Sequence, residues 1–203
     1  MLIRKKRSVS WRLWLGGIVA IIVISGAIYG GQRYMQMNNA KKVAATTIAQ
    51  FPRIDSSTLT LTQVKILATL RAEYAAQPPG TKYSQGASEP WCADFVSWVM
   101  KEADTPLSNP NSGSWRIPGT MTLRDYFKEQ GRWHAYGDNY SPKTGDIAIY
   151  DGNGPNGQHT NFVLQYENGI LTTIGGNENG RIRIQRYKLA DPLKLIGFGS
   201  LPA

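Results

Sequence analysis

The first third of the chain contains one long apolar run, whereas the rest shows short amphipathic patterns. Residues 13–32 carry no charged side chain. At about 1.5 Å per residue, this run is long enough to cross a hydrocarbon core of roughly 30 Å as one helix. The cluster RKKR at 4–7 precedes the run and, by the positive-inside tendency, favours a cytoplasmic N-terminus. We therefore expect a basic cytoplasmic segment at 1–12, a transmembrane signal-anchor at 13–32 and an exported remainder.

A cleaved signal peptide is the alternative interpretation of the same run. Residues 13–24 have the length of a signal-peptide core, and Ser25-Gly26-Ala27 resembles a small-x-small cleavage site. Apolar residues continue beyond that site, which favours the retained anchor. Residues 33–58 have partial helical character broken by PRIDSST, so we expect a tether there.

Three segments have the periodicity of amphipathic helices. They are 60–76, 91–103 and 120–130. In the second segment, a polar stripe lies opposite an apolar side. The stripe consists of Asp94, Ser97, Lys101 and Asp104. We expect this stripe to face water.

The C-terminal half of the chain predicts strands. They are 146–150, 160–166, 170–174, 181–187 and 196–201. Asn168-Gly169 between two of them is typical of a tight hairpin turn. Helices come first and an antiparallel meander follows, so the sequence predicts an α+β domain over 59–203.

Charge narrows the choice of partner. The 203 residues carry a formal net charge of +9, with 23 Lys and Arg against 14 Asp and Glu. Residues 1–42 hold eight of these basic residues and no acid, so the remainder is almost neutral. A near-neutral domain lacks the basic surface typical of nucleic-acid binding. The basic excess instead fits the flanks of a membrane anchor.

Cys92 is the single cysteine, and it lies in the first turn of the second predicted helix. A lone buried cysteine is often only a small apolar residue. A helix N-terminus lowers a thiol pKa, however, and a neighbouring imidazole lowers it further and activates the sulfur as a nucleophile. His159, at the start of a predicted strand, is the expected partner. His134, in GRWHAYG, is expected to be a packing or surface residue.

A third side chain should orient the imidazole. Asn177 follows the strand that pairs with the histidine strand, so we expect its amide near His159, with Glu178 as the fallback. The alternative is that Asn177 only supports a turn with positive φ.

At these positions the chain resembles the CHAP domain (cysteine, histidine-dependent amidohydrolase/peptidase), a branch of the papain-like NlpC/P60 superfamily. WCADFVS, GDIAIYD, HTNFV and TTIGGN carry the resemblance, which covers roughly 60–200. It implies a papain-like CHAP fold, with N-terminal helices packed on an antiparallel sheet. It also implies cleavage of peptidoglycan amide bonds, by an N-acetylmuramoyl-L-alanine amidase or a peptide endopeptidase. Cys92 would be the nucleophile, His159 the base and Asn177 the orienting residue.

One position departs from the family pattern. Many members carry an acid two residues before that asparagine, and Gly175 stands there in this chain. An amide alone does not stabilise an imidazolium by charge, so the departure allows a slower or differently tuned enzyme, or a degenerate one.

Four further residues are candidates for the substrate site. Tyr83 and Gln85, upstream of Cys92, are each either the second oxyanion donor or a turn residue. Trp91 and Trp115 either line a groove for sugar or peptide or pack in the core and its rim.

Two other functions are alternatives to the hydrolysis of peptidoglycan. A non-catalytic wall-binding or scaffold module and a protease acting on exported proteins are the alternatives. The two histidines lie 25 residues apart and no HExxH motif occurs, so a zinc site is not indicated. No G-x-S-x-G motif of a serine hydrolase occurs. No dinucleotide-binding or P-loop glycine pattern occurs either, so we expect no metal and no cofactor. We expect peptidoglycan and the bacterial cell membrane as partners, with a protein secreted after signal cleavage as the alternative.

Overall fold

A computed structural model describes residues 46–48, 50–152, 157–189 and 194–202. These residues belong to one compact unit. The expected cytoplasmic segment, signal-anchor, cleavage site and first part of the tether lie outside the described residues. Within the described ranges, no helix combines the length and the apolar composition needed to cross a bilayer.

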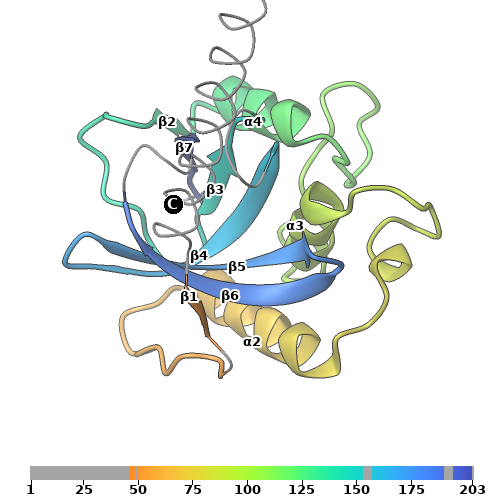
Figure 1. The fold of residues 1–203 in the computed structure, drawn as a ribbon. Coiled ribbons are helices and arrows are strands. Elements are labelled where there is room, and N and C mark those ends of the chain that lie inside the picture. The colour runs from red at the N-terminus through yellow and green to blue at the C-terminus, as the bar shows by residue number, and fades with distance from the viewer. Residues whose placement is uncertain (1–45, 49, 153–156, 190–193, 203) are drawn as a thin grey trace, which may run out of the picture. The chain divides into compact units, whose positions relative to one another are not determined.

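Apart from one short strand at its start, the unit has its helices in the first half and its strands in the second half (Figure 1). The elements in chain order are β1 (Thr46–Ile48), α2 (Leu61–Ala76), η1 (Gly80–Lys82), α3 (Cys92–Glu102), α4 (Thr120–Glu129), β2 (Trp133–Ala135), β3 (Ile147–Tyr150), β4 (His159–Glu167), β5 (Ile170–Glu178), β6 (Arg181–Lys188) and β7 (Leu195–Gly199). The α+β arrangement and the predicted helices and strands are therefore confirmed. Three short elements were not predicted from the sequence: the strands β1 and β2 and the single turn η1.

Local signals explain where α2 begins and ends. Thr60 caps its N-terminus, because Oγ1 of Thr60 accepts from the backbone of Gln63 while the Gln63 side chain accepts from the backbone of Thr60. At the other end, Gln77 adopts a left-handed conformation with φ of +47°, and two prolines follow. The helix is thus bounded on both sides by its own sequence.

The strands form one antiparallel sheet with the order β1-β6-β5-β4-β3-β7-β2. The β4–β5 turn uses Asn168 and Gly169, both at positive φ, as the sequence predicted. The β5–β6 turn uses Asn179 and Gly180 in the same way. Because these hairpins join neighbouring strands, His159 on β4 and the end of β5 come to lie in adjacent parts of the sheet.

The core has two parts, because alternate residues of each strand face opposite sides of the sheet. On one side, Phe162 and Ile174 pack with apolar residues of the helices, including Phe95 and Leu70. On the other side, a smaller cluster includes Tyr150, Val163, Tyr187 and Phe198. The larger cluster holds α3 against β4 and β5, which is the packing that places the start of α3 beside the sheet.

The N-terminal boundary of the folded unit differs from the predicted one. The sequence predicted a tether up to residue 58, but β1 pairs with β6. Phe51, Ile54 and Leu59 also pack against the core. The pattern was missed because a three-residue strand is too short to show periodicity. Residues 46–48 and 50–58 therefore belong to the folded unit.

Candidate active site

The thiol of Cys92 lies at the start of α3 and is almost covered. Cys92 is the first helical residue, and it is 5% exposed. Its Sγ lies 3.8 Å from Oγ1 of Thr120, the first residue of α4. Two helix N-termini therefore meet at the sulfur, and both favour negative charge there.

The environment of Cys92 favours the thiolate. Burial raises the pKa of this thiol, but the hydrogen bond and the positive charge of His159 lower it, as do the hydroxyl of Thr120 and the backbone of Ala93, so the net pKa is lowered. A thiol ionised in this way is the nucleophilic form of cysteine.

His159 is the first residue of β4 and is 6% exposed. Burial lowers the pKa of its imidazole, but Cys92 and Glu178 raise it more, to about 9. Nε2 of His159 lies 3.5 Å from Oε1 of Glu178, a contact between charges rather than a short hydrogen bond. The structure thus brings Cys92, His159 and Glu178 together as a thiol, an imidazole and a carboxylate.

The carboxylate beside His159 belongs to Glu178, the fallback from the sequence, and no contact between Asn177 and His159 is found among the described residues. Gly175 pairs with Arg183, and Glu178 pairs with Arg181, so three steps on β5 match two on β6. This bulge includes Asn177, whose φ is +60°. This positive φ fits the alternative expectation for Asn177, a residue that supports a turn, and the extra residue turns Glu178 to the side of the sheet that Gly175 faces.

The space beside Gly175 is already occupied. A side-chain carbon at this position would overlap Oδ1 of Asn161 and would lie 3.0 Å from Oε1 of Glu178. Nδ2 of Asn161 donates to the same Oε1 at 3.1 Å, and the Gln185 amide donates to Oε2. The acid missing at 175 is thus replaced by one that reaches the same region from 178, held by two amide donors.

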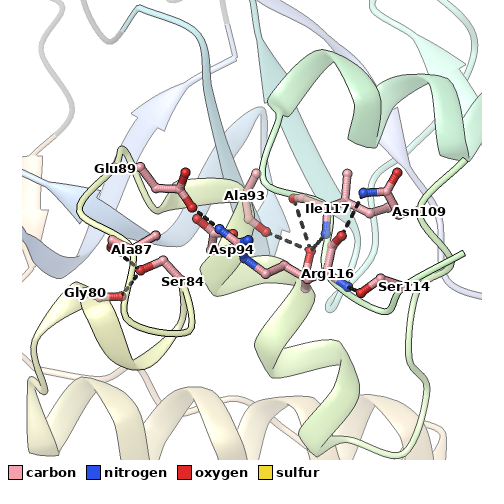
Figure 2. A network of polar contacts seen from close by, with 11 residues as sticks. Gly80, Ser84, Ala87, Glu89, Ala93, Asp94, Asn109, Ser114, Arg116 and Ile117 are labelled. Carbon is pink, nitrogen blue, oxygen red and sulfur yellow. Dashed lines mark hydrogen bonds and ion pairs between the residues drawn. The ribbon is translucent and has the colours of Figure 1, made fainter. Parts of the chain in front are cut away.

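The loop before α4 is tied to α3 by buried polar contacts. Figure 2 shows the Arg116 side chain between the carboxylates of Glu89 and Asp94. Nε of Arg116 lies 2.7 Å from Oδ1 of Asp94. Oγ of Ser97 accepts from the backbone N–H of Ile117 at 3.0 Å. Because these contacts lie just before Thr120 in the chain, they hold the loop where its last residue meets the sulfur.

These contacts correct the predicted polar stripe of α3. Asp94 and Ser97 have no exposed surface, because the loop covers them. Burial raises the pKa of Asp94 to about 6, and the adjacent Arg116 guanidinium favours the charged form. Lys101 and Asp104 are exposed, as predicted for the outer part of the stripe.

Tyr83 does not offer its hydroxyl to the site. Its side chain is completely buried, and its hydroxyl donates to Oε2 of Glu73 at 2.7 Å. Lys82 contacts the same carboxylate. The ring of Tyr83 stacks on Trp91 at 5.2 Å between centroids. Both Tyr83 and Trp91 are therefore core residues that support the segment before Cys92. Core packing is one of the two alternatives expected for Trp91, whereas Tyr83 was expected to be an oxyanion donor or a turn residue.

The other two substrate-site candidates are closer to the surface. Gln85 is exposed in a turn with φ of +57°, and no hydrogen bond among the described residues joins it to Cys92. Trp115 is half-buried, and Nζ of Lys101 lies 5.2 Å from its ring centroid. His134 stacks on Tyr140 with 3.6 Å between ring centroids, the packing role expected for it.

Two features of the site were missed from the sequence. Thr120 was predicted only as the start of a helix, and its position in the sequence relative to Cys92 gave no sign that the two side chains are in contact. Arg116 lies in an irregular loop, where no periodicity predicts burial. Among the described residues, no group of three or more His, Cys, Asp or Glu is arranged to hold a metal ion.

Comparison with known proteins gives one family match. Residues 83–177 match the CHAP domain. Among solved structures, the chain is similar to one described as the crystal structure of Ly7917 with the hydrolyzing product of MDP, with a TM-score of 0.45 and 14% identity. That similarity covers 71% of this chain and 64% of the other chain. No curated protein matches the chain significantly.

Proposed function

Because this chain carries a CHAP domain at residues 83–177, we propose that it is a cysteine-dependent amidohydrolase that cleaves amide bonds of peptidoglycan. The observation that carries the proposal is the mutual effect of Cys92 and His159. The pKa of the thiol is lowered and that of the imidazole is raised to about 9. This combination favours a thiolate–imidazolium pair, which is the reactive form of a cysteine hydrolase.

The chemistry follows from the positions of these groups. The Cys92 thiolate adds to the scissile carbonyl, forming a C–S bond. The imidazolium of His159 gives its proton to the amine as the C–N bond breaks. Water then adds to the thioester while His159 takes a proton from it, and the carboxylic acid leaves as the C–S bond breaks. Glu178 keeps the imidazole oriented and stabilises its positive charge.

The carbonyl oxygen becomes negatively charged during this addition, and the start of α3 supplies a donor. The backbone N–H of Cys92 is in the first turn, where no intrahelical partner exists. One such donor is worth about 3 kcal/mol in the transition state. The Thr120 hydroxyl, 3.8 Å from the sulfur, is the candidate for the second donor. Gln85 stays a weaker candidate because its side chain is exposed.

The carboxylate of Glu178 argues against the alternative that the protein is a non-catalytic wall-binding module. That alternative rested on Gly175 in place of an acid. Glu178 supplies a carboxylate to His159 in its place, which favours an active enzyme over an inert module.

Digestion of purified peptidoglycan by the full-length protein tests the proposal. We expect soluble fragments to be released, and Cys92→Ala to reduce the rate by on the order of 10⁴- to 10⁶-fold, as in other enzymes that lose a nucleophile. Mass spectrometry of the fragments names the bond, because an amidase and an endopeptidase leave different new amines. Equal release by both proteins would disprove the cysteine mechanism. Cleavage of unfolded casein, without cleavage of peptidoglycan, would support the protease alternative.

We also propose that residues 13–32 anchor the protein in the bacterial membrane, with the domain outside the cytoplasm. The uncharged run and the basic cluster before it support this location. The anchored protein should sediment with membranes at its full mass of 22.5 kDa. Recovery of a shorter chain in the medium would indicate signal cleavage instead.

A further inference from the structure

The carboxylate of Glu178 is held by amide groups from the strands on both sides of β5. Nδ2 of Asn161, on β4, donates to Oε1 of Glu178 at 3.1 Å, and the amide of Gln185, on β6, donates to Oε2. Glu178 itself is the last residue of β5, which lies between these two strands. Each carboxylate oxygen therefore has one amide donor, and Oε1 is also the atom that lies 3.5 Å from Nε2 of His159.

The contact with His159 is too long to fix the carboxylate by itself. A charge-assisted hydrogen bond between nitrogen and a carboxylate oxygen is typically about 2.7–2.9 Å long, and this contact is 3.5 Å. Glu178 is 8% exposed, and a buried carboxylate needs hydrogen-bond donors in place of water. A glutamate side chain also loses much conformational freedom when it is held in one position. Asn161 and Gln185 supply the hydrogen bonds that hold it there.

Arginines on β6 compete with His159 for this carboxylate. Arg181 is the strand partner of Glu178, and Arg183 is the strand partner of Gly175. A guanidinium group binds a carboxylate well, because it can donate two parallel hydrogen bonds. Among the described residues, however, Glu178 forms an ion pair with His159 and with neither arginine. The position of the two amide donors accounts for this preference.

The amide of Asn161 is used as a donor only. Nδ2 donates to Glu178 and, at 3.3 Å, to Oγ1 of Thr173, whereas Oδ1 is buried and has no partner among the described residues. Asn109 behaves differently, because its amide donates to one backbone carbonyl of its own loop and accepts from one backbone N–H. That asparagine braces a loop with both ends of its amide, whereas Asn161 uses the donor end on the carboxylate.

We propose that Asn161 and Gln185 are positioning residues, which act on the reaction through Glu178 by holding its carboxylate against His159. No hydrogen bond joins either amide to Cys92 or His159 among the described residues, so neither is a catalytic residue. The inference deepens the proposed function and rests on it for the effect on hydrolysis. The effect on the imidazole of His159 can be measured without any hydrolysis.

Titration of the His159 ring, followed by NMR of the full-length protein with isotopically labelled histidine in detergent micelles, tests the proposal. Glu178 contributes to the raised pKa of His159, about 9, so a carboxylate that is no longer held should leave the ring with a lower pKa. In Asn161→Leu, which keeps the size but has no donor, we expect the midpoint to fall by about 0.5 to 1 pH unit. Gln185→Leu, at a partly exposed position, should shift it in the same direction. The matched control is Thr172→Val, a buried β5 residue whose side chain has no hydrogen bond to Glu178 among the described residues, and it should leave the midpoint unchanged.

A double variant separates positioning from a general effect on folding. If Asn161 acts through Glu178, Asn161→Leu should not lower the midpoint further in a Glu178→Gln background. Equal falls in both backgrounds would overturn the proposal, and so would an unchanged midpoint in both Asn161→Leu and Gln185→Leu.

The effect on hydrolysis is measured separately. On peptidoglycan, kcat/KM of Asn161→Leu should fall by about 10- to 100-fold, as is typical when a partner that orients a functional group is removed. Its alkaline limb should also begin at a lower pH, which a loss of stability alone would not cause. Absence of hydrolysis by the unaltered protein would refute the proposed function, whereas the titration of His159 would still decide whether the two amides position Glu178.

Discussion

Oε1 of Glu178 lies 3.5 Å from Nε2 of His159 because β5 contains a bulge at Asn177. Phe162 pairs with Ile174 on the neighbouring strands. Continuing that pairing without a bulge would put Asn177 opposite His159. The extra residue moves the amide away and brings a negative charge to the imidazole instead.

The first prediction separates the roles of these two neighbours. Glu178→Gln removes the negative charge beside the imidazole, and we expect it to lower kcat/KM on peptidoglycan by about 10²- to 10⁴-fold. Asn177→Gly should keep activity close to that of the unaltered protein, because glycine adopts positive φ readily. Fragment release measured at matched protein concentration checks both. The reverse ranking would show that the amide of Asn177 orients His159.

The second prediction concerns the alkaline side of the pH profile. The pKa of His159 is raised to about 9, so the imidazolium is present below that pH and is lost as pH rises through it. We therefore expect kcat/KM to fall above about pH 9. In Glu178→Gln the pKa of His159 should be lower, and the fall should begin at a lower pH. Rates measured from pH 5 to 11, in steps of about half a unit, test this, and an alkaline limb that Glu178→Gln does not move would contradict it.

The third prediction concerns Thr120. Its hydroxyl favours the Cys92 thiolate, so Thr120→Val should raise the thiol pKa and slow alkylation of Cys92 by iodoacetamide at pH 7 by about three- to tenfold. Thr120→Ser keeps a hydroxyl and should restore the faster rate. Since Cys92 is the single cysteine, the labelled mass reports this site alone. An unchanged pH dependence of alkylation in Thr120→Val would exclude the electrostatic role.

The fourth prediction concerns the contact between Arg116 and Asp94. Asp94 has no exposed surface, so Arg116→Gln should lower the free energy of unfolding by about 3 kcal/mol by leaving a buried carboxylate without its ion partner. The double variant Asp94→Asn/Arg116→Gln should recover part of this loss, because it removes the uncompensated charge. Urea unfolding followed by tryptophan fluorescence measures each step. Strictly additive losses would mean that the two side chains do not interact energetically.

The fifth prediction concerns Gly175. Placing the family acid there, as Gly175→Asp, should reduce activity, because the new side chain would overlap Asn161 and displace Glu178. Overpacking of this kind typically costs about 1–3 kcal/mol of stability. Gly175→Ala is the matched control without charge, and it should be similarly destabilised. A gain in activity on introduction of the acid would show that Glu178 does not serve His159.

Sequence reasoning succeeded where a pattern extends over several residues. The observed elements are indicated by the amphipathic period of α3, the alternation in β6 and the Asn168-Gly169 turn. The predicted start of α3 also placed Cys92 correctly in the first turn of that helix. It was less successful where a single residue or loop determines which side chains are in contact. The bulge at Asn177 changes which side chain meets His159 without altering the strand pattern.

Burial by loops was also beyond the reach of periodicity. Asp94 and Ser97 occupy polar positions of α3, yet the loop that carries Arg116 covers them. The hydroxyl of Tyr83 seemed available as an oxyanion donor, but Glu73 on α2 already accepts from it. Such pairings join segments that are unrelated in sequence, so no local pattern contains them.

The burial of Cys92 has a consequence for the substrates that reach it. Because only 5% of this residue is exposed, a scissile amide has to come into close contact with the protein surface around the sulfur before it reacts. We expect a flexible peptide strand to do so more readily than the rigid backbone of a folded exported protein.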